Sequence, residues 1–224
     1  MRPLRSKAGK WTATVVSTRT EMDRKWVPEK VTVVRKIVSF AGEERDETVL
    51  EAQETKDGRT RDVTAVIAAE AKKSLEREKK RRTEEPPQPG ENPHRGGRMS
   101  LDEILPFSAK KRPDYVFRPV EGASLDGAPA VVLDVEPKIQ DDRHWRGRLW
   151  FDPATADLRR AEIKPADNPP FVKEIQIAVS FDAHPSGPLL IRSFRIKINA
   201  GMFLKHVRQE IVEEYSDYRI GDSR

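Results

Sequence analysis

The stretch PPFVKEIQIAVSFDAHPSGPLLIRSFRIKINA, residues 169–200, decides the fold. In its first half Ile175, Ile177 and Val179 fall on one face of an extended chain, while Glu174 and Gln176 fall on the other. A Pro-Ser-Gly turn at residues 185–187 then reverses the chain into a second alternating segment. Long antiparallel strands joined by tight turns build a curved sheet, whose concave face can hold something apolar.

The segments on either side continue this pattern. In RGRLWFDPATADLRRAEIKP, residues 146–165, Leu149 and Phe151 alternate with Trp150 before a turn and a returning strand at 157–164. Upstream, residues 131–135 alternate as a strand, and Asp126-Gly127 is a strong hairpin signal. Downstream, the apolar residues of 203–219 recur every four positions, which fits a helix face and a strand face equally well.

The first third of the chain has strand composition too. Residues 10–20 and 30–40 are rich in β-branched side chains. In the second of these segments Val31 and Val33 share one face but Val34 and Val38 share the other, which predicts a bulge or a strand buried on both faces. Residues 47–55 are ambiguous between an edge strand and a helix, and we favour the strand.

From Asp62 onward the apolar period changes to four. Val63, Ile67, Ala71 and Leu75 predict an amphipathic helix over 62–75, with Asp62 as its N-cap. Its continuation, 72–82, holds seven basic and two acidic residues, so it is either a solvated helix end or a contact site for an acidic partner or lipid headgroups.

Residues 83–98, TEEPPQPGENPHRGGR, contain four prolines and three glycines. They cannot bury enough apolar surface to offset their ordering entropy, so we predict a flexible loop that acts as a lid over the sheet or as a tether. A second, short helix is expected over 100–107, where a serine N-cap precedes Glu103 at the capping-box spacing. We interpret residues 1–224 as a single domain.

Composition limits the classes of function. Charged residues make up 35% of the chain, the mean hydropathy is −0.72 and the net charge is +5. Basic and acidic residues are interleaved, as on a solvated surface, so we do not expect nucleic acid as a partner. The absence of cysteine excludes thiolate zinc sites.

Neither an export signal nor a transmembrane segment is recognisable. The chain as given has no apolar core of a signal peptide behind its first residues and no run of 18 apolar residues. A strand pattern begins almost at once, at Trp11, which leaves open that an upstream segment was removed or that the start codon is misplaced.

No catalytic set, cofactor motif or metal-ligand spacing stands out, so we predict a protein that is not an enzyme and holds no metal or cofactor. The one acid–base pair worth testing is Asp142 with His144, and a polar loop explains it as well. Trp145 and Trp150 flank Arg146-Gly147-Arg148 and are either packing residues or a gate at the mouth of a cavity.

Several of these segments resemble the bacterial outer-membrane lipoprotein-sorting proteins, the lipoprotein-carrier-like (LolA-like) superfamily, which also includes periplasmic regulators of envelope-stress signalling. The resemblance is carried by GRLWFDPATADLRRAEI (147–163), VKEIQIAVSFD (172–182), LLIRSFRIKI (189–198) and IVEEYSDYR (211–219), and it spans about residues 100–220. The chain departs from the group by lacking a signal peptide and an opening amphipathic helix, and by carrying the 83–98 loop.

This resemblance implies an α+β fold that is mainly antiparallel β, a strongly curved half-open barrel with helices covering its concave face. It implies a hydrophobic cavity that binds a lipid or the acyl chain of a lipoprotein, as in outer-membrane lipoprotein sorting, and a location in the periplasm or cell envelope. The alternative is an envelope protein-interaction or sensor module, in which the 72–82 helix and the 83–98 loop dock a partner such as a membrane-bound protein. The residues expected to line the cavity are Leu133, Val135, Phe151, Ile175, Ile177, Val179, Phe194 and Ile196.

Overall fold

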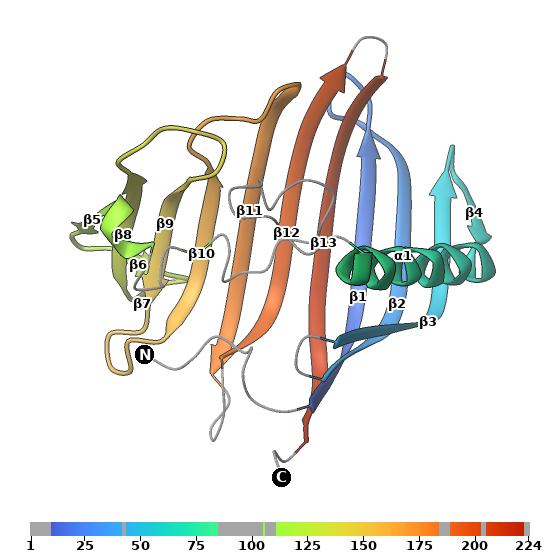
Figure 1. The fold of residues 1–224 in the computed structure, drawn as a ribbon, viewed down its shortest axis with the longest axis horizontal. Coiled ribbons are helices and arrows are strands. Elements are labelled where there is room, and N and C mark those ends of the chain that lie inside the picture. The colour runs from blue at the N-terminus through green and yellow to red at the C-terminus, as the bar shows by residue number, and fades with distance from the viewer. Residues whose placement is uncertain are drawn as a thin grey trace.

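A computed structural model describes residues 10–41, 44–84, 105, 111–183, 189–202 and 205–221. Eleven strands form one antiparallel sheet in the order β4-β3-β2-β1-β13-β12-β11-β10-β9-β8-β5 (Figure 1). The first group of strands is β1 (Lys10–Met22), β2 (Pro28–Ala41), β3 (Glu44–Lys56) and β4 (Arg59–Asp62). The second group is β5 (Tyr115–Val120), β8 (Val131–Pro137), β9 (Trp145–Phe151), β10 (Leu158–Pro165), β11 (Val172–Ala183), β12 (Leu189–Met202) and β13 (Lys205–Ile220).

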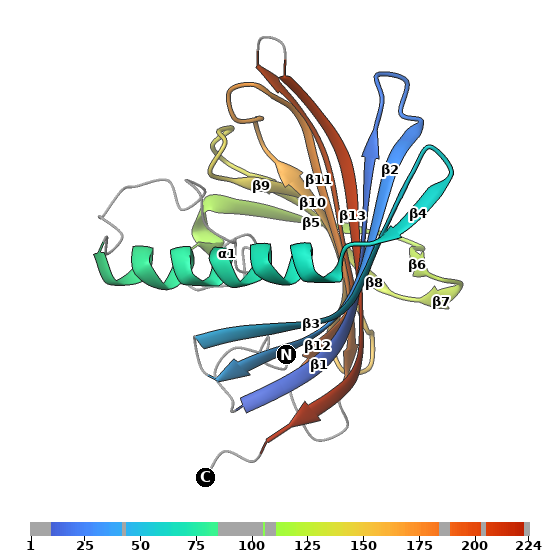
Figure 2. The ribbon, with the colours of Figure 1, turned by 90° about the vertical axis from the view of Figure 1, so that its right-hand side faces the viewer.

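The first and last long strands join the two groups. β1 pairs with β13 along most of its length, from Trp11 opposite Ile220 to Glu21 opposite Gln209. The edge strands β4 and β5 do not pair with each other in the described part of the chain, so the sheet stays open. Figure 2 shows the strands bending over one side, which gives a half-open trough. The predicted mainly antiparallel, strongly curved architecture is therefore confirmed.

The segment left undecided between helix and strand is a strand. β13 spans 16 residues and is paired on both sides, with β1 and with β12. Residues 47–55, for which a strand was favoured, lie within β3. The Asp126-Gly127 signal also holds, because both residues have positive φ, 51° and 83°, at the turn between β6 (Ser124–Leu125) and β7 (Ala128–Pro129).

The explanation offered for the change of phase in β2 is wrong. β2 pairs with β1 without interruption from Ala41 to Lys30, and only its even-numbered face is buried. Val33 and Ile37, on the other face, are each 40% exposed. The bulge lies in the neighbouring strand instead, where Leu50 of β3 is the extra residue opposite the step from Arg35 to Lys36.

One α-helix, α1 (Thr64–Glu84), lies on the concave side of the sheet and runs out from its edge at β4 (Figure 2). Asp62 precedes the N-cap position, which Val63 holds, but its carboxylate still accepts a hydrogen bond from the Thr64 N–H at 2.8 Å and so pairs one free N–H of the first turn. The buried Val63 fixes the start of the helix, since its N–H donates to the Ala52 carbonyl at 2.9 Å. The first two residues of the predicted 83–98 loop belong to this helix, and 85–98 lie outside the described residues.

The expected helical cover is not seen in the described residues. α1 packs mainly against β3 and leaves Val66 59% exposed. The predicted helix at 100–107 lies outside the described residues except for Leu105, which forms a bend. The Leu105 side chain is 1% exposed and packs into the core on the concave face of β8–β12. A 3₁₀ turn, η1 (Arg112–Asp114), leads into β5.

Candidate ligand-binding face

The concave face of β8–β12 is continuously apolar. Strand register places its side chains opposite one another, with Ile163 facing Ile177 and Ile177 facing Ile196. Ala161 faces Val179, and Val179 faces Phe194 in the next strand. Because cross-strand partners share a face of the sheet, one apolar surface runs over five adjacent strands.

All eight residues predicted to line a cavity lie on this face. Three are core residues, namely Val135, Ile177 and Val179, whose exposure is 2% or less. The other five are only partly buried: Leu133, Phe151, Ile175, Phe194 and Ile196. Val131, on the same face opposite Phe151, is 48% exposed. Apolar surface is therefore still open on this face among the described residues, and the ligand role of the eight residues stays a prediction.

The two tryptophans proposed as a gate lie on opposite faces of β9. Trp145 is 3% exposed and belongs to the concave core. Trp150 is on the convex face, with the guanidinium groups of Arg148 and Arg160 each 6.0 Å from its ring centroid. Only Trp145 is thus on the side of the apolar surface, and the gate role stays a prediction.

Sequence reasoning missed a buried charge cluster on the concave face of β1–β3 and β13. Lys36 Nζ lies 3.2 Å from Glu47 Oε1 and 3.3 Å from Glu213 Oε1, and the three side chains are 9%, 8% and 18% exposed. The Tyr215 hydroxyl donates to Glu213 Oε2 at 2.7 Å. The signal was a lysine at an inward-facing position of β2, between Val34 and Val38.

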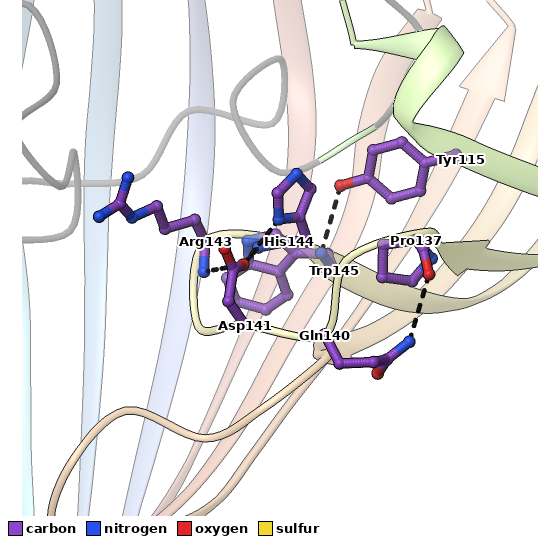
Figure 3. Close-up of polar contacts among 7 residues, drawn as sticks. All are labelled: Tyr115, Pro137, Gln140, Asp141, Arg143, His144 and Trp145. Carbon is purple, nitrogen blue, oxygen red and sulfur yellow. Dashed lines mark hydrogen bonds and ion pairs between the residues drawn. The ribbon is translucent and has the colours of Figure 1, made fainter.

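The acid–base pair predicted at Asp142 and His144 is formed by a different carboxylate. Asp141 Oδ1 is 2.6 Å from His144 Nδ1 and also accepts the backbone N–H groups of Arg143 and His144 (Figure 3). Burial acts to raise the pKa of Asp141, but these hydrogen bonds together lower it below its ordinary value.

The contacts around this pair hold the loop before β9 in place. The Tyr115 ring lies 5.9 Å from the His144 ring, and its hydroxyl accepts the Trp145 N–H at 3.3 Å (Figure 3). Burial raises the pKa of Tyr115, so this phenol stays neutral. Asp141 binds its own loop three residues ahead, an arrangement that fixes the entry into β9.

Described residues line at least two pockets. One, of about 230 Å³, lies beside the β6–β7 hairpin and brings together Phe151, Phe181, Arg159 and Arg192. The other, of about 340 Å³, is polar and is lined by residues from β9 to β12. Within the described residues, no group of His, Asp and Glu side chains is placed to hold a metal ion. No described helix has the length and apolar character needed to span a bilayer.

Neither a protein-family model nor a curated protein sequence matches the chain. Among solved structures, it is similar to a LolA superfamily protein from Nitrosomonas europaea, at 14% identity and a TM-score of 0.40, covering 99% of this chain and 90% of that one. It is also similar to a putative outer membrane lipoprotein-sorting protein domain from Vibrio parahaemolyticus, at 9% identity and a TM-score of 0.39, covering 96% and 87%.

A third similar structure is the MucA/MucB complex of Pseudomonas aeruginosa, at 12% identity and a TM-score of 0.26, covering 96% of this chain and 94% of that one.

Proposed function

We propose that this protein is a non-enzymatic binder of a lipid or of the acyl chain of a lipoprotein, acting in the cell envelope. The ligand lies on the concave face of β8–β12. One observation carries the proposal: apolar side chains from five adjacent strands share this face, and several of them, such as Ile175 and Ile196, are only partly buried. Apolar surface left partly open on one side of a sheet is a feature of interaction sites.

The energetics favour a chain-like ligand lying along the face. Each methylene taken out of water contributes about 0.8 kcal/mol, so a few buried carbons suffice for measurable binding. The pocket at Phe151 and Phe181 holds only about 230 Å³, and pockets for drug-sized ligands start at roughly 300 Å³. A bound chain would therefore lie along the side chains of the concave face, such as Phe194, and not be enclosed in one pocket.

Uptake of a fluorescent fatty acid tests the proposal, with a pair of variants on one strand. Phe194→Gln makes the concave face polar, and Arg195→Gln changes the next residue, which points to the convex face and is exposed. We expect Phe194→Gln to weaken uptake at least about tenfold, equivalent to roughly 1.4 kcal/mol, and Arg195→Gln to leave it unchanged. Equal uptake by both variants would refute binding on this face.

A second candidate function is protein interaction or sensing through α1. Lys72, Lys73 and Arg77 are exposed, and the helix carrying them runs away from the sheet (Figure 2). These features favour docking of an acidic partner. Deleting residues 85–98 separates the two functions: lipid exchange kinetics should change if the segment serves the apolar face, whereas only partner capture should change if it serves docking.

A further inference from the structure

Three of the four most exposed large apolar residues in the described part of the chain lie in loops at one end of the sheet. They are Phe171, Ile139 and Val27, which are 64%, 58% and 54% exposed. Their loops, residues 166–171, 138–144 and 23–27, form a rim at the end where β12 also turns into β13 (Figure 1). Single exposed apolar residues are ordinary, but several gathered at one rim indicate an interaction site.

The backbone holds Phe171 in this exposed position. Its φ is +67°, a left-handed conformation that bulky side chains rarely adopt. Two hydrogen bonds fix the chain around it: the Gly201 N–H of β12 donates to the Phe171 carbonyl at 2.9 Å, and the Val172 N–H donates to the Pro169 carbonyl at 3.0 Å. Strained residues persist where the surrounding structure over-determines them, and such residues cluster at functional sites.

The β1–β2 loop, which carries Val27, is fixed in a similar way. Asp23 Oδ1 accepts the backbone N–H groups of Lys25 and Val27, at 2.7 and 2.9 Å. Trp26 also has a positive φ, 64°, and its ring packs against Lys197 of β12, whose Nζ lies 4.2 Å from the ring centroid. β12 therefore contacts both this loop and the β10–β11 loop, so the apolar side chains of the rim are held on one support.

The apolar concave face reaches this rim. Val172 of β11 lies opposite Ala200 of β12, and Ala200 lies opposite Val207 of β13, which is 47% exposed. Two residues before Ala200, Ile198 lies opposite Ile175, one of the residues expected to bind the ligand. Cross-strand partners share a face of the sheet, so an acyl chain at the rim meets apolar side chains from there onto the concave face.

Basic side chains accompany the exposed apolar residues. Exposed cations in or beside the rim loops that form no ion pair within the described part of the chain include Arg24, Lys25, Lys138, Arg143 and Lys173. Three of the four acids in these loops accept backbone N–H groups of their own loops, which offset part of their charge: Asp23, Asp141 and Asp167. Apolar side chains flanked by cations suit the surface of a bilayer that contains anionic phospholipids.

We propose that this rim docks on the surface of a phospholipid bilayer that contains anionic lipids. The exposed apolar side chains, Phe171 foremost, enter the headgroup region, and the cations beside them contact lipid phosphates. The end of the concave face then lies at the membrane. Docking extends the proposed lipid binding but does not depend on it, because it rests on the exposed residues and charges of the rim.

Co-sedimentation of the full chain with vesicles tests the docking. We expect binding to vesicles of phosphatidylglycerol and phosphatidylcholine, and weaker binding when salt is added or when the vesicles contain phosphatidylcholine alone. Phe171→Asn should weaken binding at least about tenfold, because it removes the most exposed apolar side chain, and asparagine tolerates a positive φ. Val66→Gln is the matched control, because Val66 is 59% exposed but lies in α1, away from the rim.

A second variant keeps the test decisive if Phe171→Asn proves unstable. Replacing both Lys25 and Lys173 with glutamine should weaken binding to the anionic vesicles and leave binding to phosphatidylcholine vesicles unchanged. Uptake of a fatty acid from solution should stay unchanged in all these variants, so loss of docking and loss of lipid binding are measured separately. Absence of binding to both kinds of vesicle, or an equal loss in Val66→Gln, overturns the proposal.

Discussion

Lys36 and Glu213 form a salt bridge across an intervening strand, with 3.3 Å between Nζ and Oε1. Their strands, β2 and β13, both pair with β1 and not with each other, so the contact spans the small inward-facing side chains of β1. Lys36 as a whole residue is 7% exposed. The pair therefore lies on the same concave side as the apolar core.

Lys36→Met should destabilise the protein by about 3–5 kcal/mol, because it leaves Glu213 buried without a cation beside it. Lys30→Met is the matched control on the same face of the same strand. Lys30 pairs with Glu21 and Glu54 and is more exposed, so its loss should cost only about 0–1 kcal/mol. Urea denaturation measures both, and equal losses would contradict a buried role for Lys36.

Gly147→Ala should destabilise the fold by at least about 3 kcal/mol, since a Cβ at this position overpacks against a neighbouring backbone. It would lie 2.0 Å from the Glu162 carbonyl oxygen of β10, and the φ of Gly147 is +155°. Gly122→Ala is the control, with φ +61° and open space around the added carbon. It should cost about 1 kcal/mol through φ alone. Thermal unfolding distinguishes the two, and similar shifts would argue against close packing of β9 on β10.

Asp141→Asn should lower stability in a pH-dependent way. The pKa of Asp141 is lower in the folded protein than its ordinary value of 3.8, so its contribution is complete above that pH and is lost as pH falls through the depressed value. The difference in melting temperature between wild type and Asp141→Asn should thus be largest near neutral pH and shrink in acid. Asp142→Asn, whose side chain forms no hydrogen bond or ion pair with the residues that the structure describes, should show no such trend. A pH-independent difference would contradict the bond to His144.

Trp145→Ala and Trp150→Ala should differ sharply in their free energy of unfolding. Trp145 is a core residue, so its truncation should cost about 3–5 kcal/mol, whereas Trp150 packs between arginines on the convex face and should cost roughly 1 kcal/mol. Fatty-acid uptake, measured where each variant is folded, should change only in Trp145→Ala if this residue borders the ligand. Unchanged uptake with unchanged stability would leave Trp145 without a role at the mouth.

The strand pattern of the fold was predictable because alternation of apolar side chains is a local signal. The conformation of the segment at 205–220 was not predictable, because its apolar residues Val207, Ile211 and Tyr215 recur every four residues. That spacing places them on one face of a helix and equally on one face of a strand. The conformation of this segment is decided by pairing with β1, at the other end of the sequence, and with β12. Non-local pairing of this kind overrides local propensity, and the sequence of the segment alone does not reveal it.

The candidate sites were predictable to different degrees. The eight concave residues follow from alternation, because one face of each strand is apolar. The Lys36 cluster joins strands far apart in sequence, so spacing cannot reveal it. Asp141 was passed over for Asp142 because adjacent carboxylates look alike in sequence, and only the loop geometry selects the one that reaches His144.

Native mass spectrometry of the protein, extracted gently from its own host, tests lipid binding on the concave face most directly. We expect a population carrying one lipid or acyl chain, and we expect that population to vanish in Phe194→Gln and to persist in Arg195→Gln. A protein that carries no lipid, and that takes up no fluorescent fatty acid afterwards, would contradict the proposed function.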